Sequence, residues 1–510
     1  MNFRILVAVA ALLAVSLGLR GERPDSIEYS AEVIANASSG DWAPYMIGSW
    51  NSGRVTEASG GWLDLSARKS LDLGKRFSWS AGVEAIFGGG TRAEYERYNA
   101  ADNTYYMHRE GTSPARLLQL WGEVKFRGVF AMAGMRAERS LIVAEGLSSG
   151  DITRSENARP IPGVTVGFVD FQNIPFTKGW VQIEGQIMYG RMTDTGWKES
   201  HFNYLNHFIA SDLMYTYKRC YFRTKPTQPL YVTVGMQTGG LFGGNTTWYS
   251  SGKVSKREDR GFHVKDLWEM FFPSEGSGEG YYKGSSLGSW DFRADLRLRT
   301  GHRLAAYFEW PWEDGSGIGR RNGWDGLWGL EYRAPRESWV DAAVLEYLDF
   351  TNMSGPIHWA PGDSKNPSIT TQATGGDNYW NNDFYGSWTN YGMSIGTPFI
   401  LAPIYNSDGY LQFKHNRARG FHAALEGRVA PQWRYKVMVS YQKAWGDGRR
   451  PIGIALHDTS AMVEALWAKG AGSPWSASLR LALDAGNLRG NNFGAMLTVR
   501  YSGALKFKKQ

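Results

Sequence analysis

The chain has 510 residues, including 62 Gly, 26 Tyr, 24 Phe and 22 Trp, with an apolar fraction of 42% and a mean hydropathy of −0.39. Glycine and aromatic residues favour strands, tight turns and membrane interfaces, which argues against a helical cytosolic enzyme. The net charge of +7 is spread along the chain, and the absence of Lys/Arg blocks beyond short pairs excludes a clustered nucleic-acid-binding surface.

The first predicted element is an N-terminal export signal. After the charged start MNFR, 15 apolar or small residues run from Ile5 to Leu19, and polar sequence begins at Arg20. The apolar run is short for a membrane span, so we expect residues 1–20 to be a signal peptide and residues 21–510 to form one domain. A single anchor helix is the alternative. The one cysteine, Cys220, can form neither an intramolecular disulfide nor a multi-cysteine metal site.

Stretches with one apolar and one polar face then recur along the chain. Asp291–Thr300 is the clearest, because charged residues alternate in it with Phe292, Ala294, Leu296 and Leu298. We expect its apolar side chains to face lipid and its charged ones to face a lumen. The other stretches are Phe77–Phe87, Val181–Gly190, Trp433–Gln442, Trp475–Asp484 and Ala495–Gly503.

These patterns favour a transmembrane barrel. The stretches have about nine to eleven residues, the length that a tilted strand needs to cross a bilayer, and several end in aromatic residues. A soluble β-sandwich or propeller is the alternative. Export and the absence of a later apolar run of roughly eighteen residues favour the barrel. About 27 residues for each strand and its loop give on the order of 16 to 20 strands.

Some segments break the alternation. Ser148–Val164 is rich in turn residues, and Gly261–Pro273 has apolar residues at helical spacing, which predicts a short amphipathic helix. Asp314–Gly326 and Ser364–Asn382 have the composition of long loops.

An ordered set of mostly non-strand stretches resembles the capsule assembly Wzi family. They are Ala37–Ile47, Asn157–Val164, Thr177–Gly190, Leu287–Phe292, Trp324–Tyr332, Met353–Trp359, Gly376–Asn382, Tyr391–Ile400 and Leu488–Arg500. The resemblance implies an all-β fold, a transmembrane antiparallel β-barrel of about 18 strands with lumen-closing loops and a few short helices. It also implies periplasmic helices at one end and an outer-membrane location in a Gram-negative bacterium.

The family resemblance further implies a lectin-like protein that attaches or helps assemble capsular or exopolysaccharide. Sugar binding uses flat aromatic faces together with amide and acidic groups. The candidate glycan-binding residues in one loop are Asn378, Tyr379, Trp380, Asn381, Asp383, Trp388 and Tyr391. A second group is Trp310, Trp312, Arg320 and Arg321, in which the arginines would match carboxylates of an acidic polymer. The alternatives are loop packing, an interfacial belt and a solvated arginine pair.

We expect no enzymatic activity, metal or cofactor. The sequence has no H-E-x-x-H, Cys/His or G-x-S-x-G pattern, and acidic pairs such as Glu313 with Asp314 are common in barrel lumens. The expected partners are the polysaccharide, outer-membrane lipid and the polysaccharide export machinery, with no nucleic acid. The competing functions are a porin-like diffusion channel for anionic solutes and a barrel hydrolase.

Overall fold

The computed structural model describes residues 26–272, 284–355, 358–359, 373–374, 376–469 and 473–506. The predicted signal peptide, residues 1–20, lies outside these ranges. No helix among the described residues is long and apolar enough to cross a membrane.

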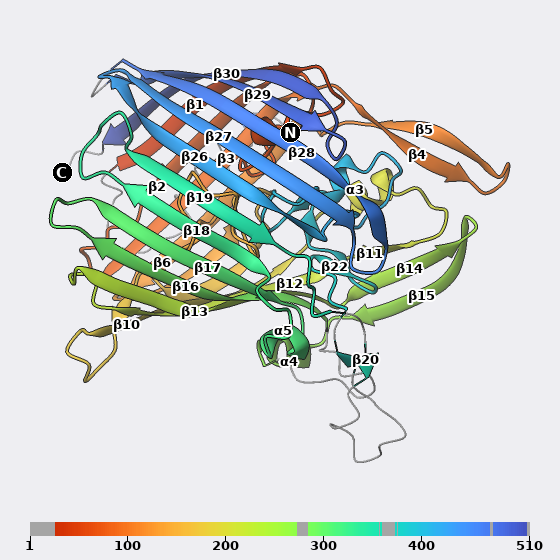
Figure 1. Cartoon of the computed structure of the whole chain (residues 1–510), viewed down its shortest axis with the longest axis horizontal. Helices are drawn as coiled ribbons and strands as arrows, with labels where there is room; N and C mark the ends of the chain where they lie inside the picture. The colour runs from red at the N-terminus through yellow and green to blue at the C-terminus, as the bar shows by residue number, and fades with distance from the viewer. Residues whose placement is uncertain are drawn as a thin grey trace, which may run out of the picture.

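The wall is a closed antiparallel barrel of 18 strands, which confirms the predicted fold class (Figure 1). β8 and β9 pair with successive parts of β10 and occupy one wall position. The wall strands are β1 (Ser26–Ser38), β2 (Gly60–Lys69), β3 (Phe77–Gly90), β6 (Ala115–Phe126), β7 (Val129–Met135), β8 (Gly163–Phe168), β9 (Gln172–Asn173), β10 (Val181–Arg191), β12 (Met214–Thr224), β13 (Leu230–Phe242), β16 (Ser285–Arg297), β17 (Arg303–Trp312), β18 (Gly326–Arg333), β19 (Ala342–Asp349), β26 (Ala418–Ala430), β27 (Trp433–Gly446), β28 (Pro451–Ala468), β29 (Trp475–Gly486) and β30 (Asn492–Lys506).

Closure of the barrel joins the two ends of the described chain. β1 pairs with β2 on one side and with β30 on the other, so that Val33 faces both Leu63 and Val499. With β8 and β9 counted as one position, every position of the wall is therefore paired on both sides, as a spanning sheet in lipid requires.

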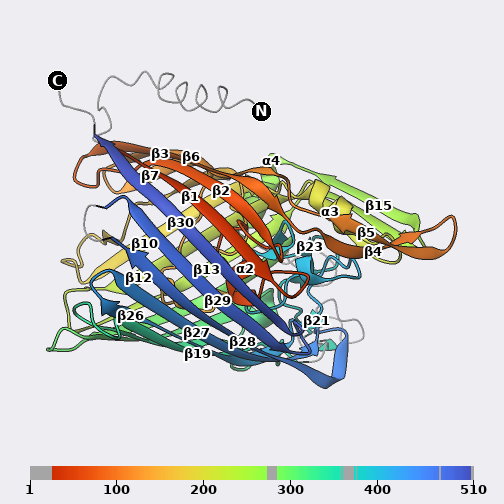
Figure 2. The same cartoon turned by 90° about the horizontal axis from the view of Figure 1, so that it is seen from above.

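The two ends of the barrel differ. The end at which β1 begins and β30 ends, here the turn end, has short connections, whereas the opposite loop end has the long ones. Two hairpins, β4 (Ala93–Asn99) with β5 (Thr104–Glu110) and β14 (Gly244–Ser250) with β15 (Lys253–Gly261), project past the loop end (Figures 1 and 2). Short turns face the periplasm and longer loops face outward in outer-membrane barrels, so by this rule the loop end faces the outside.

The face assignment of β16 is confirmed. Asp291 and Asp295 are buried at 0% and 4% exposure, whereas Phe292 and Leu296 are 42% and 38% exposed on the outer wall. Arg293 lies inside, where its guanidinium pairs with Asp295 and Glu331 at 3.0 and 2.7 Å. The predicted strand was too long at its end, because β16 stops at Arg297 and residues 298–302 form the turn to β17.

Three loops fold into the lumen: residues 39–59, 136–162 and 376–417. Inward-facing carboxylates of the wall accept hydrogen bonds from their backbone, as Glu346 does from Ser149 at 2.7 Å and Asp484 from Tyr45 at 2.9 Å. Side chains of all three loops belong to one buried core with inward residues of the wall. The loops therefore fill this part of the barrel with a packed interior, in agreement with the predicted lumen-closing loops.

The remaining described elements are short. They are α2 (Tyr45–Gly48), α3 (Thr195–His201), α4 (Val264–Phe271), α5 (Gly315–Ile318), η2 (Pro403–Tyr405), β11 (Phe208–Ser211), β20 (His358–Trp359), β21 (Ala373–Thr374), β22 (Asn381–Asn382), β23 (Gly386–Ser387), β24 (Thr389–Asn390) and β25 (Met393–Ser394). α4 confirms the predicted amphipathic helix. It lies against the outer wall, where the Lys218 amine donates to the carbonyl of Met270 at 3.0 Å.

Candidate functional site

A cavity of about 1630 Å³ lies between the lumen loops and the turn end. Its charged residues pair with each other: Arg54 of a lumen loop contacts Asp64 of β2 at 2.9 Å and Glu84 of β3, and Arg219 of β12 contacts Glu184 of the neighbouring β10 at 2.9 Å. Because these charges are already paired, the cavity wall alternates between positive and negative side chains, and neither sign of charge dominates.

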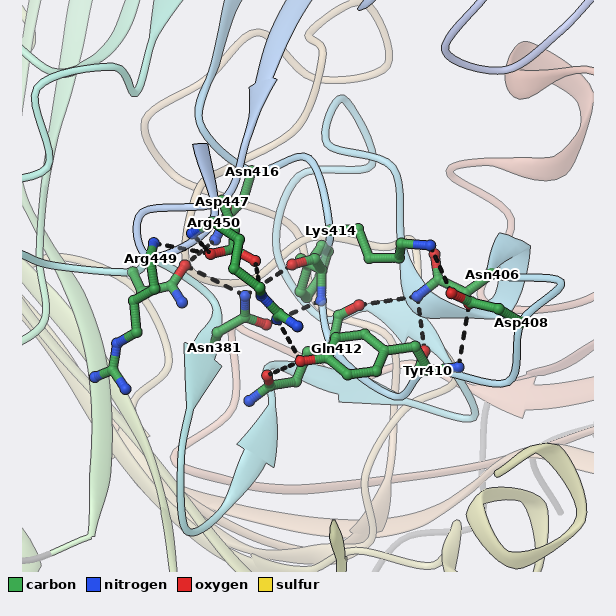
Figure 3. A network of polar contacts seen from close by, with 12 residues as sticks. Asn381, Asn406, Asp408, Tyr410, Gln412, Lys414, Asn416, Asp447, Arg449 and Arg450 are labelled. Carbon is green, nitrogen blue, oxygen red and sulfur yellow. Dashed lines mark hydrogen bonds and ion pairs between the residues drawn. The ribbon is translucent and has the colours of Figure 1, made fainter. Parts of the chain in front are cut away.

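A second polar site, the outer polar cluster, lies at the loop end (Figure 3). We define it as Asp383, Asp408, Tyr410, Gln412, Lys414, Asp447, Arg449 and Arg450. Arg450 donates from Nε to Asp447 at 3.0 Å and from Nη2 to the Tyr410 hydroxyl, and its guanidinium lies 4.6 Å from the Tyr410 ring centroid. Arg449 pairs with Asp383, and Lys414 with Asp408 at 2.7 Å.

Asparagine side chains fix the backbone under this cluster. Asn406 donates from Nδ2 to the carbonyls of Tyr410 and Gln412, at 2.7 and 2.9 Å. Asn381 both donates to the Phe413 carbonyl and accepts from the Phe413 amide, each at 2.9 Å. Gly409 has a φ of +67°, which favours glycine, and allows the tight turn that presents Tyr410. The cluster is therefore held in one geometry before any ligand arrives.

His207 lies under the cluster, and its ring centroid is 4.2 Å from that of Tyr410. Burial, with a further contribution from the Arg450 charge, lowers the pKa of His207 to about 4. The imidazole is therefore neutral near pH 7, and Arg449, Arg450 and Lys414 supply the positive charge of the site.

The outer polar cluster remains accessible to solvent. The side chains of Arg449 and Arg450 are 45% and 57% exposed, and that of Lys414 is 38% exposed. Phe384, next to Asp383, is 49% exposed and packs edge-on against Trp248. The site thus offers guanidinium donors, carboxylate acceptors and aromatic surface, the groups with which proteins bind acidic sugars.

The predicted loop residues divide between the interior and the surface. Tyr379, Trp380 and Trp388 are at most 2% exposed, and the two indoles donate to the carbonyls of Ile152 and Thr153 at 3.1 and 2.8 Å. These rings belong to the lumen core, so glycan contact by them would require the loop to open and stays a prediction.

The predicted amides have structural partners, and two other residues of this group reach the surface. Asn378 accepts from Asn416 at 2.8 Å, and Asn381 supports the cluster backbone. Asp383 belongs to the outer polar cluster itself, while the partly exposed Tyr391 donates to the Thr193 carbonyl at 2.9 Å.

The second predicted group lies elsewhere, at the loop end of β17 and in the loop after it. Trp310 faces outward and stacks on Trp324, whereas Trp312 is buried at 3% exposure. Arg320 and Arg321 are exposed, and the Arg320 guanidinium is 6.0 Å from the Trp310 ring centroid. The structure therefore brings Trp310 and Arg320 together.

Sequence reasoning missed most of that cluster. Tyr410, Arg449 and Arg450 were not among the candidates, and His207 is some two hundred residues away from them in the chain. The turn GDGRR was the one local signal, because it places two arginines at a strand connection, but nothing local reveals that Tyr410 meets them.

The fold belongs to the class of outer-membrane β-barrels. The structure is similar to that of Wzi from Escherichia coli, described as an outer membrane protein involved in group 1 capsule assembly and a carbohydrate-binding β-barrel. The TM-score is 0.54 at 14% identity, covering 99% of this chain and 88% of that one. The TM-score with OccAB2 of Acinetobacter baumannii is 0.48 at 8% identity, covering 95% of this chain and 100% of that one. The TM-score with OprD of Pseudomonas aeruginosa is 0.44 at 11% identity, covering 95% of this chain and 96% of that one.

No protein-family model and no curated protein matches this sequence. At 14% identity the likeness to Wzi shows a shared fold.

Proposed function

We propose that this chain is an integral protein of the Gram-negative outer membrane that attaches or helps assemble capsular or exopolysaccharide at the cell surface, without enzymatic turnover. The observation that carries the proposal is the fixed, accessible outer polar cluster above a lumen packed with loops. The fold shared with Wzi, described as carbohydrate-binding and as involved in capsule assembly, agrees with it.

The cluster suits an acidic polymer. Arg450 and Arg449 have exposed guanidinium edges that can form charge-assisted hydrogen bonds with sugar carboxylates. Asp447 and Asp383 can accept from sugar hydroxyls, and the ring of Tyr410 can pack against a pyranose face. Since the asparagines fix the backbone beforehand, little conformational entropy is lost when the polymer binds.

The competing function is a diffusion channel for anionic solutes, which the cavity of about 1630 Å³ near the turn end favours. Against it stands the core inside the barrel, because Ile47, Ile152 and Phe399 are at most 1% exposed there. A diffusion channel needs a continuous aqueous path, and a core of this kind opposes one. The outer-membrane lipid and the polysaccharide export machinery are the further partners in this proposal.

Two measurements test the proposal. In cells lacking the gene, cell-associated polysaccharide should fall and shed polysaccharide rise with the total unchanged. With purified protein, Arg450→Ala should weaken binding of the isolated polysaccharide about tenfold, because a charge-assisted hydrogen bond contributes ~1.5–3 kcal/mol. Arg109→Ala is the matched control, since Arg109 is exposed and paired with Glu94 on the β4–β5 hairpin.

The proposal fails if polymer stays on the deletion cells while uptake of a small anionic solute falls, a result that supports the channel. If the Arg450→Ala and Arg109→Ala proteins bind the polysaccharide equally well, the outer polar cluster is not part of the binding site.

A further inference from the structure

A pocket of about 460 Å³ lies on the outside of the barrel wall, and none of its lining residues belongs to the outer polar cluster. We call it the outer-wall pocket; it is lined by Trp324, Asp325, Trp328, Tyr347, Asp349, Thr351 and Asn352. Leu327 and Leu348 are fully buried in the lumen core, so the adjacent Trp328 and Tyr347 point outward. β18 begins and β19 ends at this level, which places the pocket at the loop end of the lipid-facing wall.

The pocket presents aromatic faces that are supported from behind. Trp324 is 69% exposed and stacks on Trp310 with ring centroids 5.5 Å apart, and Trp328 stacks on Phe308 at 3.9 Å. Such supported rings match the apolar faces of sugars. An aromatic girdle at the membrane interface would need only these rings, whereas this pocket also contains polar groups.

The polar groups are held at the pocket edge. Asp349 accepts from the Tyr347 hydroxyl at 2.8 Å and from the Thr351 hydroxyl at 2.6 Å. Asn352 is exposed, and its backbone amide donates to Asp325 at 3.0 Å. The side-chain amide of Asn352 and the remaining lone pairs of the Asp349 carboxylate can therefore hydrogen-bond to sugar hydroxyls.

Basic residues flank the pocket on the same outer face. Arg419 and Lys443 are direct cross-strand partners on β26 and β27, and both are exposed. Like charges directly opposite each other destabilise a sheet, and an anion between them would remove that penalty. Asp349 opposes Arg419 from the other side, so the three groups carry a net charge of +1. Within the described ranges Lys443 forms no ion pair.

Apolar residues continue from the basic pair toward the turn end. Phe421, Val439 and Leu345 follow on the outer faces of the same strands and are 54%, 43% and 53% exposed. Because Asp349 pairs with both Gly326 and Arg419, the cations lie level with the start of β18, which is two residues along the chain from both Trp324 and Trp328, and apolar surface lies below them. This arrangement matches a lipid whose phosphate and sugar lie at one level, above its acyl chains.

We propose that the outer-wall pocket binds a phosphorylated glycolipid of the outer leaflet. Its phosphate lies between Arg419 and Lys443, its sugar ring packs against Trp324 and Trp328, and its acyl chains run along the apolar face below. This site does not rest on the polysaccharide proposal, because none of its residues belongs to the outer polar cluster.

The test is native mass spectrometry of the delipidated full chain in detergent, titrated with diphosphorylated lipid A or with phosphatidylglycerol. We expect lipid A to bind more tightly than phosphatidylglycerol. The Arg419→Gln/Lys443→Gln protein should bind lipid A about tenfold more weakly, as expected for loss of charge-assisted hydrogen bonds. Trp324→Ala should weaken lipid A binding and leave phosphatidylglycerol binding unchanged.

Two control variants separate the pocket from general lipid affinity. Trp433 is 46% exposed on the outer wall at the turn end, and Lys253 is exposed on the β14–β15 hairpin, so Trp433→Ala and Lys253→Gln should bind lipid A like the original protein. Equal affinity for the two lipids, or equal losses in the control variants, would overturn the proposal. Competition by a deacylated sugar phosphate at the concentration at which lipid A binds would also overturn it, because the site would then not require a lipid.

Discussion

Replacing Trp388 by alanine should increase the ion conductance of the barrel. This residue joins the three parts of the structure that would have to separate for ions to pass. Its indole Nε1 donates to the Thr153 carbonyl of a second lumen loop at 2.8 Å, and its ring lies 5.6 Å from that of Tyr215 on the wall. The ring also lies over Gly239, where a Cβ would come within 2.4 Å of it. The variant thus removes contacts between both loops and the wall at once.

The magnitude follows from burial. Trp388 is 2% exposed, and replacing such a core tryptophan by alanine costs about 3–5 kcal/mol. If this loss falls on the docking of the loops, the open population rises roughly a hundred- to several-thousand-fold, since every 1.4 kcal/mol is tenfold. The wall itself should persist, because its strands keep their pairing on both sides.

Planar lipid bilayers provide the assay. The original protein should show rare, brief conductance events, and Trp388→Ala frequent ones, while both run as folded barrels on unheated gels. Trp433→Ala is the control, because that tryptophan is exposed on the outer wall, on the side that faces away from the lumen loops. Steady conductance by the original protein, or equally rare events in the Trp388→Ala protein, would refute the conclusion that these contacts close the lumen.

The free energy of unfolding should fall by ~3 kcal/mol as the pH drops from about 6.5 to 4, because burial lowers the pKa of His207 from 6.5 to about 4 and only the unfolded chain takes up a proton there in this range. This decrease should be smaller in the His207→Gln protein, as measured by urea unfolding at several pH values. Gly396→Ala should prevent or destabilise folding by several kcal/mol, since its Cβ would lie 1.9 Å from the Ile152 carbonyl, whereas Gly89→Ala, with open space around it, should be neutral in the same refolding assay. Leu481→Arg, on the lipid face of β29, should cost ~2–4 kcal/mol in unfolding from vesicles, compared with a smaller loss for Leu481→Ala.

The wall could be predicted from the sequence because its signal is local. Alternation between two faces is visible within ten residues, so Asp291 and Phe292 were assigned to opposite faces without knowledge of their neighbours. The end of β16 was not visible in this way, because Leu298 and Arg299 continue the alternation into a turn. Pattern alone cannot detect that the chain reverses before Gly301, where φ is +87°.

The lumen loops could not be assigned in the same way, because their partners are distant in sequence. Trp380 and Trp324 look alike in a sequence, as tryptophans among Asn, Asp and Gly. The indole of Trp380 donates to the Ile152 carbonyl and is 2% exposed, whereas Trp324 is 69% exposed. Only the fold decides which of the two fills the core and which can meet a ligand.

The inward carboxylates of the wall connect the predicted pattern to the unpredicted loops. A loop inside a barrel must satisfy its backbone amides, because an unpaired buried amide costs ~1–3 kcal/mol. Glu346 accepts from the Ser149 amide at 2.7 Å, and Glu309 from the Ile152 amide at 3.1 Å. The alternating acidic residues that resemble a channel lining in sequence thus hold the loops in place. A polar face along a strand therefore does not distinguish an open pore from a plugged barrel; the partners of its carboxylates do.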